Sequence, residues 1–162
     1  NGNVWFVQNV KIVPDADTEI LALDSLNTRQ TAIVQKKFAN EITSKIFPVD
    51  STDSIELVAH QPNYLKYKSN SAKEKLAVFS EVYYPEGWNV YVDGNEANYF
   101  KADYILRAMM VPKGTHIIEF KFEPEVVKTG SNISLASNIV LILIVLGGLF
   151  YGYRKKASTA EA

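Results

Sequence analysis

Aromatic and polar side chains are concentrated between Tyr83 and Tyr104, and this mixture suggests contact with a sugar. Flat amphipathic rings beside Asp, Asn and Arg side chains can form a carbohydrate-binding surface, but buried aromatic residues also build the cores of β-sandwiches. An exposed aromatic row would favour binding, and a buried one would favour a scaffold. The residues that we predict as carbohydrate or acceptor contacts are Tyr83, Trp88, Tyr91, Asp93, Tyr99 and Arg107.

Arg107 has two structural alternatives to ligand binding. It lies in the middle of an expected strand, where it can face solvent or pair with an acidic side chain. The acidic residues considered for such a pair are Glu81, Asp93 and Asp103.

The sequence does not indicate a metal site, a disulfide or a nucleophilic catalytic site. The chain has no cysteine, which excludes disulfides and thiolate metal sites, and His116 has no histidine partner at metal-ligand spacing because His60 is distant. The acidic run 50–53 lacks the ligand spacing of a calcium loop and is predicted to be a solvated turn. No Ser–His–acid grouping is recognisable. We therefore predict no catalytic residue, metal site or cofactor in this chain.

An uncharged segment near the C-terminus predicts one membrane-spanning helix. No charged residue occurs from Thr129 to Tyr153, and residues 139–146 are Ile, Val and Leu only. A helix over residues 129–153 would cover roughly 37 Å, more than the roughly 30 Å of hydrocarbon in a bilayer. A buried helix of a soluble protein would usually keep a polar stripe, which is missing here.

The flanking charges predict the orientation of this helix. Three basic residues, Arg154, Lys155 and Lys156, follow the span directly, whereas Lys128 stands alone before it. By the positive-inside rule, the tail 154–162 is cytoplasmic and the residues before the span are extracytoplasmic. The whole chain has 17 basic and 18 acidic residues, so no basic surface for nucleic acid is expected.

Residues 1–53 are predicted to form a strand–helix–strand segment. Branched and aromatic residues indicate one strand over Asn3–Val13, and Asp15 or Asp17 can cap a helix over Ala16–Leu26. A second strand follows at Thr31–Gln35, and Lys36–Phe47 is ambiguous. No glycine-rich loop accompanies this unit, so a nucleotide site is not expected.

Residues 54–124 are predicted to form an antiparallel, jelly-roll-like β-sandwich. Apolar and polar residues alternate from Ile55 onward, and turn residues recur every few positions. Asp93-Gly94 is a strong turn signal, and Tyr104–Val111 and His116–Phe122 are expected to form a hairpin. The fold prediction is therefore mainly β, followed by one C-terminal membrane helix.

The stretch from Ala77 to Pro124 resembles the C-terminal extracytoplasmic segment of the YfhO family of bacterial membrane proteins. The shared features also include a final membrane helix and an upstream series over Trp5–Val34. The matched motifs are Tyr84-Pro85-x-Gly87-Trp88, Val92-Asp93-Gly94, Tyr104-Ile105-Leu106-Arg107-Ala108, Val111-Pro112-x-Gly114-x-His116 and Glu119-Phe120.

This resemblance implies a function for the parent protein. The family looks like polytopic glycosyltransferases of the GT-C type, which move sugars from polyprenyl-phosphate carriers onto cell-envelope polymers. Their catalytic acidic residues are expected in an early extracytoplasmic loop that this chain does not contain. The chain opens on Asn1-Gly2-Asn3 without an initiator methionine, and we interpret it as the C-terminal piece of a longer protein.

Together these observations predict a non-catalytic extracytoplasmic β-domain in the bacterial cytoplasmic membrane. It would be the accessory C-terminal part of a GT-C-like glycosyltransferase. The alternatives are a carbohydrate-binding module that contacts the acceptor polymer and a purely structural domain that docks on the membrane body. Expected partners are the lipid bilayer, the rest of the parent protein and a cell-envelope glycan, without nucleic acid.

Overall fold

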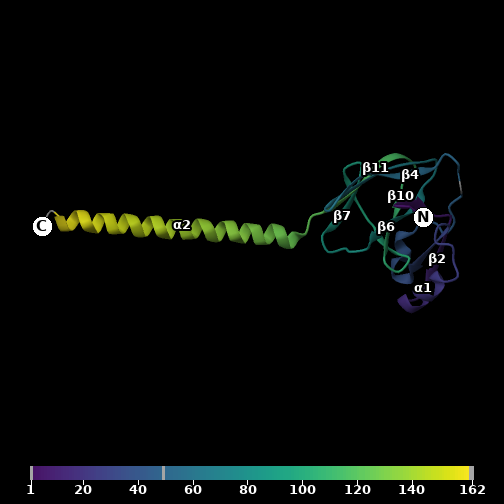
Figure 1. The fold of residues 1–162 in the computed structure, drawn as a ribbon, viewed down its shortest axis with the longest axis horizontal. Helices are drawn as coiled ribbons and strands as arrows, with labels where there is room; N and C mark the ends of the chain where they lie inside the picture. The colour runs from purple at the N-terminus through teal and green to yellow at the C-terminus, as the bar shows by residue number, and fades with distance from the viewer. Residues whose placement is uncertain (1, 49, 161–162) are drawn as a thin grey trace. The chain divides into compact units, whose positions relative to one another are not determined.

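The computed structural model describes residues 2–48 and 50–160 of the chain (Figure 1). The chain divides into two compact units, Asn1–Glu123 and Pro124–Ala162, which are described separately below. The first unit holds all the strands, and the second consists of one long helix. The predicted fold class, mainly β with antiparallel sheets and a single C-terminal helix, is confirmed.

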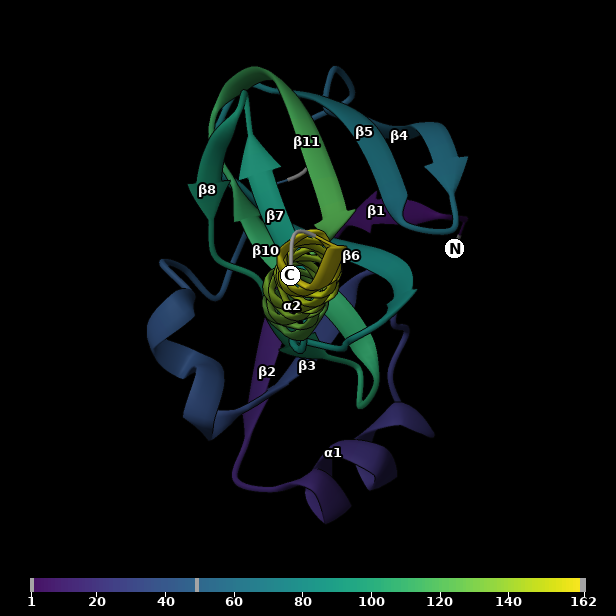
Figure 2. The ribbon, with the colours of Figure 1, turned by 90° about the vertical axis from the view of Figure 1, so that its left-hand side faces the viewer.

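Two antiparallel sheets form most of the first unit (Figure 2). The chain crosses repeatedly between them, so strands that are consecutive in sequence often lie in different layers. The four-stranded sheet contains, in spatial order, β1 (Val4–Phe6), β6 (Lys75–Val82), β10 (Leu106–Val111) and β9 (Phe100–Ala102). The five-stranded sheet contains β4 (Ser54–Gln61), β5 (Tyr64–Ser71), β11 (Gly114–Phe122), β7 (Trp88–Val92) and β8 (Asn95–Ala97).

The two sheets pack face to face around an aromatic core. Tyr67 of β5, Phe79 of β6 and Phe120 of β11 are fully buried, and their rings meet edge to face with centroids 4.8 to 6.2 Å apart. Ring pairs in this geometry stabilise a core beyond the area that they bury. The core therefore uses the inward-facing residues of both sheets, as period-two alternation predicts.

A parallel strand pair covers the other face of the four-stranded sheet. It is formed by β2 (Asn9–Val13) and β3 (Thr31–Gln35), which are connected through α1 (Ala16–Leu23). Buried side chains of this pair, including Val10 and Val34, pack against Leu76 and Val78 of β6. Because both of its faces are covered, β6 is buried at every position from Lys75 to Phe79.

The N-terminal helix begins as the sequence predicts and ends earlier. The Asp15 side chain accepts a hydrogen bond of 2.8 Å from the backbone N–H of Thr18, which confirms the predicted cap. The helix ends at Leu23, three residues before the predicted end at Leu26. The ambiguous segment after β3 contains a short 3₁₀ helix, η1 (Lys36–Glu41).

The single strand predicted over Asn3–Val13 is wrong, because the structure divides it into β1 and β2. The backbone N–H of Val7 donates to Leu76 of β6, whereas that of Gln8 donates to Gln30 beside β3. The neighbouring residues Val7 and Gln8 thus bond to different sheets. The apolar sequence continues through this point, so it does not indicate that the chain passes from one sheet to the other. As a result, β1 joins the four-stranded sheet and β2 joins the pair beneath it.

The predicted hairpin over Tyr104–Val111 and His116–Phe122 is also wrong. β10 begins at Leu106, because Asp103 and Tyr104 have φ angles of 48° and 71° that no strand allows. β10 and β11 then belong to different sheets, so their connection crosses between layers. Alternation identifies strands without showing which sheet each one joins.

The turn predicted at Asp93-Gly94 joins β7 to β8 and gives a stability prediction. Val92 pairs with Asn95, and the two turn residues have φ angles of 51° and 83°, as a two-residue type I′ turn requires. A Cβ atom at Gly94 would meet nothing within 4 Å, so a substitution is opposed only by backbone strain. Gly94→Val should lower the free energy of unfolding by about 1–3 kcal/mol in urea denaturation. Gly94→Asn is the control, since asparagine tolerates this conformation; equal losses would contradict the turn assignment.

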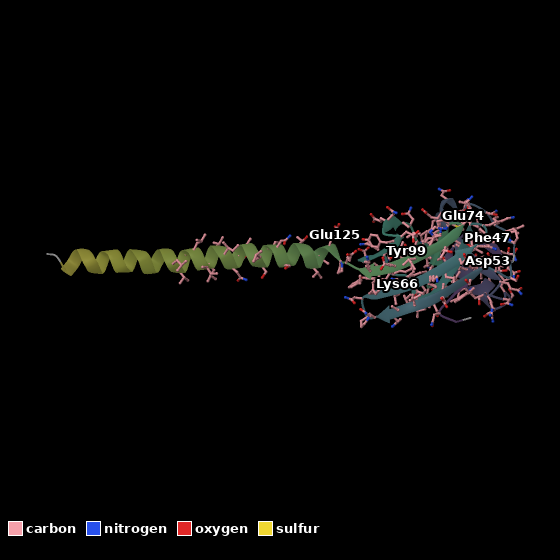
Figure 3. All side chains as sticks on the ribbon, turned by 90° about the horizontal axis from the view of Figure 1, so that it is seen from above. Phe47, Asp53, Lys66, Glu74, Tyr99 and Glu125 are labelled. Carbon is pink, nitrogen blue, oxygen red and sulfur yellow. The ribbon has the colours of Figure 1, made fainter. Side chains whose placement is uncertain are left out.

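The second unit is the helix α2 (Glu125–Ala160), whose described side chains project on all sides (Figure 3). Residues Glu125–Gly148 are long and apolar enough to cross a membrane, by length and composition, and none of the apolar window is buried. The helix continues through the start of the predicted tail, whose last residues, 161–162, lie outside the described residues.

Candidate functional site

The six predicted sugar contacts lie in separate places. Alternation along β7 turns Trp88 toward the sandwich interior and Tyr91 toward the outer face of the five-stranded sheet. Tyr83, Tyr99 and Arg107 lie with Trp88 at one end of the interior. Asp93 occupies the turn after β7.

Tyr99 and Tyr83 form an aromatic contact at this end of the sandwich. The Tyr99 ring is 5.5 Å from that of Tyr83 and 5.5 Å from that of Phe120. The Tyr99 hydroxyl lies 3.0 and 3.1 Å from the carbonyl oxygens of Tyr84 and Trp88. Burial raises the pKa of both tyrosines, so their hydroxyls stay neutral donors at physiological pH.

Arg107 is buried among aromatic rings. It is 3% exposed, its Nε donates to the carbonyl oxygen of Val82 at 2.9 Å, and its guanidinium lies 4.3 Å from the ring centre of Trp88 and 5.2 Å from that of Phe120. Burial lowers the pKa of Arg107. Its Nη1 and the Tyr67 hydroxyl have no hydrogen-bond partner in the described structure.

None of the three suggested acidic partners forms an ion pair with Arg107. Among residues 2–48 and 50–160, the ion pairs within 4.0 Å involve other side chains. The hypotheses of a surface arginine and of a carboxylate-paired arginine are therefore both wrong. Cation–π contacts with Trp88 and Phe120 take the place of a counter-ion.

Arg107→Met should raise the free energy of unfolding by about 1–2 kcal/mol. Methionine fills the space of the arginine stem and removes a desolvated charge that forms no ion pair within 4.0 Å among the described residues. Arg107→Ala is the matched comparison, and it should destabilise because it also leaves a cavity beside Trp88. Urea denaturation measures both changes. A loss of stability in the methionine variant as large as that in the alanine variant would show that the guanidinium itself stabilises the fold.

Tyr91 and Asp93 are held by local partners outside the interior. The Tyr91 hydroxyl donates to Glu123 at 2.9 Å, and Lys121 Nζ lies 4.8 Å from the centre of its ring. The Asp93 carboxylate contacts Nδ1 of His116 at 2.6 Å and accepts a hydrogen bond from the N–H of Ile117. The contact with His116 lowers the pKa of Asp93, and the same contact raises that of His116.

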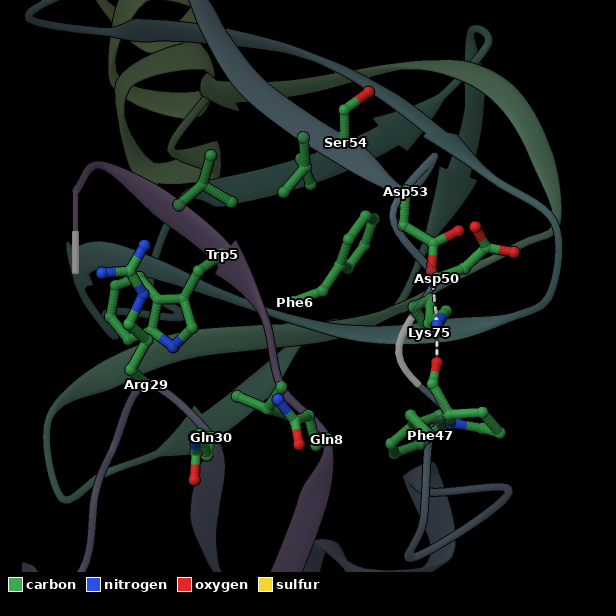
Figure 4. A pocket seen from close by; sticks show the side chains of 14 residues that line it. Trp5, Phe6, Gln8, Arg29, Gln30, Phe47, Asp50, Asp53, Ser54 and Lys75 are labelled. Atoms are coloured by element: carbon green, nitrogen blue, oxygen red, sulfur yellow. Dashed lines mark hydrogen bonds and ion pairs between the residues drawn. The ribbon is translucent and has the colours of Figure 1, made fainter.

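A pocket that the sequence did not reveal lies between the edge strands β1 and β4 (Figure 4). Its volume is about 430 Å³. Beside it, Lys75 Nζ and Asp53 Oδ2 form an ion pair at 2.5 Å, with side chains only 5% and 7% exposed. The lining residues are Val4, Trp5, Phe6, Val7, Gln8, Arg29, Gln30, Phe47, Pro48, Asp50, Asp53, Ser54, Ile55 and Lys75.

The acidic loop beside this pocket corrects one prediction. Asp50 is exposed, as a solvated turn requires, but the Asp53 side chain is buried against Lys75. Lys75 Nζ also donates to the carbonyl oxygen of Pro48, and Asp53 Oδ1 accepts from the N–H of Ala72 at 3.1 Å. These contacts attach the loop to the start of β6.

Two further buried carboxylates, those of Glu19 and Asp103, connect α1 and β3 to the turn before β10. Glu19 is fully buried and accepts hydrogen bonds from Gln35 Nε2 at 2.6 Å and from the N–H of Tyr104 at 2.9 Å. Asp103 accepts from the N–H of Ile33 at 2.8 Å, and its other oxygen has no partner in the described structure. Burial, and to a smaller extent the nearby charge of Glu19, raises the pKa of Asp103 to about 6.

The raised pKa of Asp103 predicts a pH dependence. The folded state holds a proton on Asp103 at pH values where the unfolded chain has lost it, so this contribution to stability is present below about pH 4 and is lost as pH rises through about 6. Asp103→Asn should keep the bond to Ile33 and raise the free energy of unfolding by about 1–3 kcal/mol at neutral pH, with little change at acid pH. Urea denaturation across this pH range measures the difference. If Asp103→Asn changes the free energy of unfolding equally at all pH values, the raised pKa of Asp103 does not cause the effect. The same conclusion would follow if the exposed control Asp17→Asn gave the same change.

Among the described residues, no group of three or more His, Cys, Asp or Glu side chains could hold a metal ion. The family model described as bacterial membrane protein YfhO matches residues 21–134. This chain belongs to the YfhO family. No curated protein matches the chain, and no solved structure matches it either.

Several residues of the YfhO motifs occupy turns or core positions of the domain. Gly87, Gly94 and Gly114 have φ angles of 107°, 83° and 114°, so each glycine occupies a conformation that other residues rarely adopt. Phe120 is fully buried, and Arg107 contacts the Trp88 ring. These residues therefore have roles in folding, and none of them lines the pocket between β1 and β4.

Proposed function

We propose that residues 2–123 form the non-catalytic, extracytoplasmic β-domain of a polytopic membrane protein. We further propose that this protein is a GT-C-like glycosyltransferase acting on cell-envelope glycopolymers, with the domain as its accessory C-terminal part. The observation that carries the proposal is the direct connection of a β-sandwich with its own core to a helix apolar enough to span a membrane. Membership of a bacterial membrane protein family supports the membrane context.

The contacts of three acidic side chains support an accessory role. Transfer from a lipid-linked donor needs an acidic base and a groove for the lipid, and one membrane helix cannot enclose such a groove. Glu19 is held by Gln35 and Tyr104, Asp53 by Lys75, and Asp93 by His116. Each of these carboxylates stabilises the fold locally, which fits catalysis elsewhere in the parent protein.

The orientation in this proposal follows from charge. Arg154, Lys155 and Lys156 follow the apolar segment, and the positive-inside rule assigns them to the cytoplasm. The β-domain would then lie outside a bacterial cytoplasmic membrane, a few residues before the span. At that position it can contact the acceptor glycan or the membrane body.

Contact with the acceptor glycan is the second candidate function. The outward-facing Tyr91, beside Lys121 and Glu123, combines an aromatic ring with polar groups on a sheet face. Trp88, Tyr99 and Arg107 instead contact one another or Phe120 in the interior. The role of the six residues in sugar contact stays a prediction.

A deletion in the parent protein tests the accessory role. Removing residues 2–123 as a whole deletes one compact unit and leaves the helix intact. We expect the variant to insert in the membrane and to lose sugar transfer, while the isolated 162-residue chain transfers no sugar from a polyprenyl-phosphate donor. Turnover by the isolated chain would refute the non-catalytic assignment. Full activity of the inserted deletion variant would refute the accessory role.

A further inference from the structure

The pocket between β1 and β4 has both polar and aromatic walls. We propose that it binds a neutral saccharide unit. This inference rests on the proposed function, because it assigns the place at which the domain would hold an acceptor glycan. Its volume of about 430 Å³ falls in the range of about 300–1,000 Å³ that is usual for small-molecule sites.

The side chains around the pocket suit the two kinds of surface on a sugar ring. Trp5, Phe6 and Phe47 line the pocket. Trp5 and Phe47 are themselves buried, and the half-buried Phe6 supplies apolar surface for the C–H groups of a pyranose. Gln8 and Gln30 supply amides that both donate and accept hydrogen bonds, as hydroxyl groups do. Figure 4 shows Arg29 beside Trp5 and the two amides along the same wall.

The edge of β1 adds backbone groups to the same wall. The N–H of Val7 donates to Leu76, and the N–H of Ser80 donates to the carbonyl oxygen of Asn3, so alternate residues of this strand bond to β6. The N–H and C=O groups of Val4 and Phe6 therefore point away from β6, at the outer edge of the sheet. Both residues line the pocket, and their backbone groups are further donors and acceptors for hydroxyls.

The balance of charge favours a neutral ligand. Lys75 and Asp53 neutralise each other and attach one wall of the pocket to β6. Arg29 and Asp50 also line the pocket, and neither takes part in an ion pair within the described residues. An anion would be repelled by Asp50 and a cation by Arg29, whereas the hydroxyls of a neutral sugar can accept from one and donate to the other.

The short strand makes an added peptide strand the weaker alternative. β1 has three residues and lies close to β4 of the opposite sheet, which restricts the length of chain that could pair along it. A peptide that adds to a sheet edge gains affinity from a row of main-chain hydrogen bonds, and this edge offers few. A compact ring needs only the space between the two edges.

The two tryptophans provide an internal control for the test. Trp5 lines the pocket and Trp88 lies beside Arg107 in the sandwich interior, so their indole N–H signals report on separate places. The full chain in lipid nanodiscs is titrated with methyl glucoside, methyl galactoside and N-acetylglucosamine and followed by ¹H–¹⁵N NMR. We expect at least one sugar to shift the Trp5 signal saturably and to leave the Trp88 signal unchanged. D-glucuronate, the anionic comparison, should bind more weakly than the best neutral sugar.

Substitutions on the exposed rim test the assignment without disturbing the core. Arg29→Ala and Gln30→Ala should each weaken binding, with about a tenfold rise in Kd for Arg29→Ala. Lys11→Ala removes an exposed cation of β2 that does not line the pocket and should leave Kd unchanged. The Trp88 signal reports whether each variant is folded.

Three outcomes would overturn the proposal. The first is that no sugar shifts the Trp5 signal saturably. The second is that the Arg29→Ala variant binds the sugar with the same Kd as the unsubstituted chain. The third is that an alternating Val–Thr peptide binds saturably and the sugars do not. This readout requires no sugar transfer, so its failure would leave the deletion test of the accessory role unaffected. Loss of the accessory role would likewise leave the binding measurement valid.

Discussion

Lys75→Met is expected to lower the free energy of unfolding of the β-domain by about 3–5 kcal/mol. Lys75 Nζ and Asp53 Oδ2 are 2.5 Å apart, and both side chains are almost fully buried. Removing the lysine leaves a buried carboxylate that, among the described residues, keeps a hydrogen bond from the N–H of Ala72. An uncompensated charge in such a place costs far more than the pair itself contributes.

A double-mutant cycle measures this effect by urea denaturation. Asp53→Leu combined with Lys75→Met removes both charges and should restore much of the stability lost by Lys75→Met alone. Lys73→Met is the matched control, because Lys73 is exposed two residues earlier in the chain. If Lys73→Met and Lys75→Met cost the same, the burial of Lys75 does not account for the loss. If the double variant is as unstable as Lys75→Met, the loss does not come from an unpaired Asp53 carboxylate.

Local patterns were sufficient to predict the fold class. Alternation from Ile55 onward reflects strands with one face in a core, and the Asp93-Gly94 turn depends on backbone conformations that favour these residue types. The cap at Asp15 is a local hydrogen bond of the same kind. Which sheet a strand joins depends on distant partners, and for this reason the hairpin between β10 and β11 was predicted wrongly.

The pocket could not be predicted, because four distant parts of the chain form it. They are residues 4–8, residues 29–30, the segment that contributes Phe47, Pro48, Asp50 and residues 53–55, and Lys75. Lys75 resembles an ordinary charged residue at the start of an apolar strand, and only the folded chain places Asp53 against it. The aromatic residues predicted to form one sugar-binding surface are instead separated in the structure. Trp88 and Tyr91 are close in sequence, but they face opposite sides of β7.

Leu143→Arg is expected to raise the free energy of membrane insertion of α2 by about 3 kcal/mol. Leu143 lies within residues 139–146, each of which is at least 51% exposed along the helix. So much exposed apolar surface requires cover by lipid tails or by other membrane helices. A charge at the centre of a membrane helix costs about 2.5–3.5 kcal/mol on insertion scales, where leucine is favourable.

Insertion of the chain into microsomes, scored by reporter tags on both sides of α2, measures this effect. The inserted-to-uninserted ratio should fall roughly 100-fold for Leu143→Arg, since each 1.4 kcal/mol changes an equilibrium tenfold. Leu143→Ala is the control and should change the ratio little, because alanine keeps the segment uncharged and apolar. In the unsubstituted chain, the tag after Arg154–Lys156 should report the cytoplasmic side. If the arginine variant inserts as well as the alanine variant, residues 139–146 do not lie at the centre of the bilayer, and the helix must bury this surface against protein.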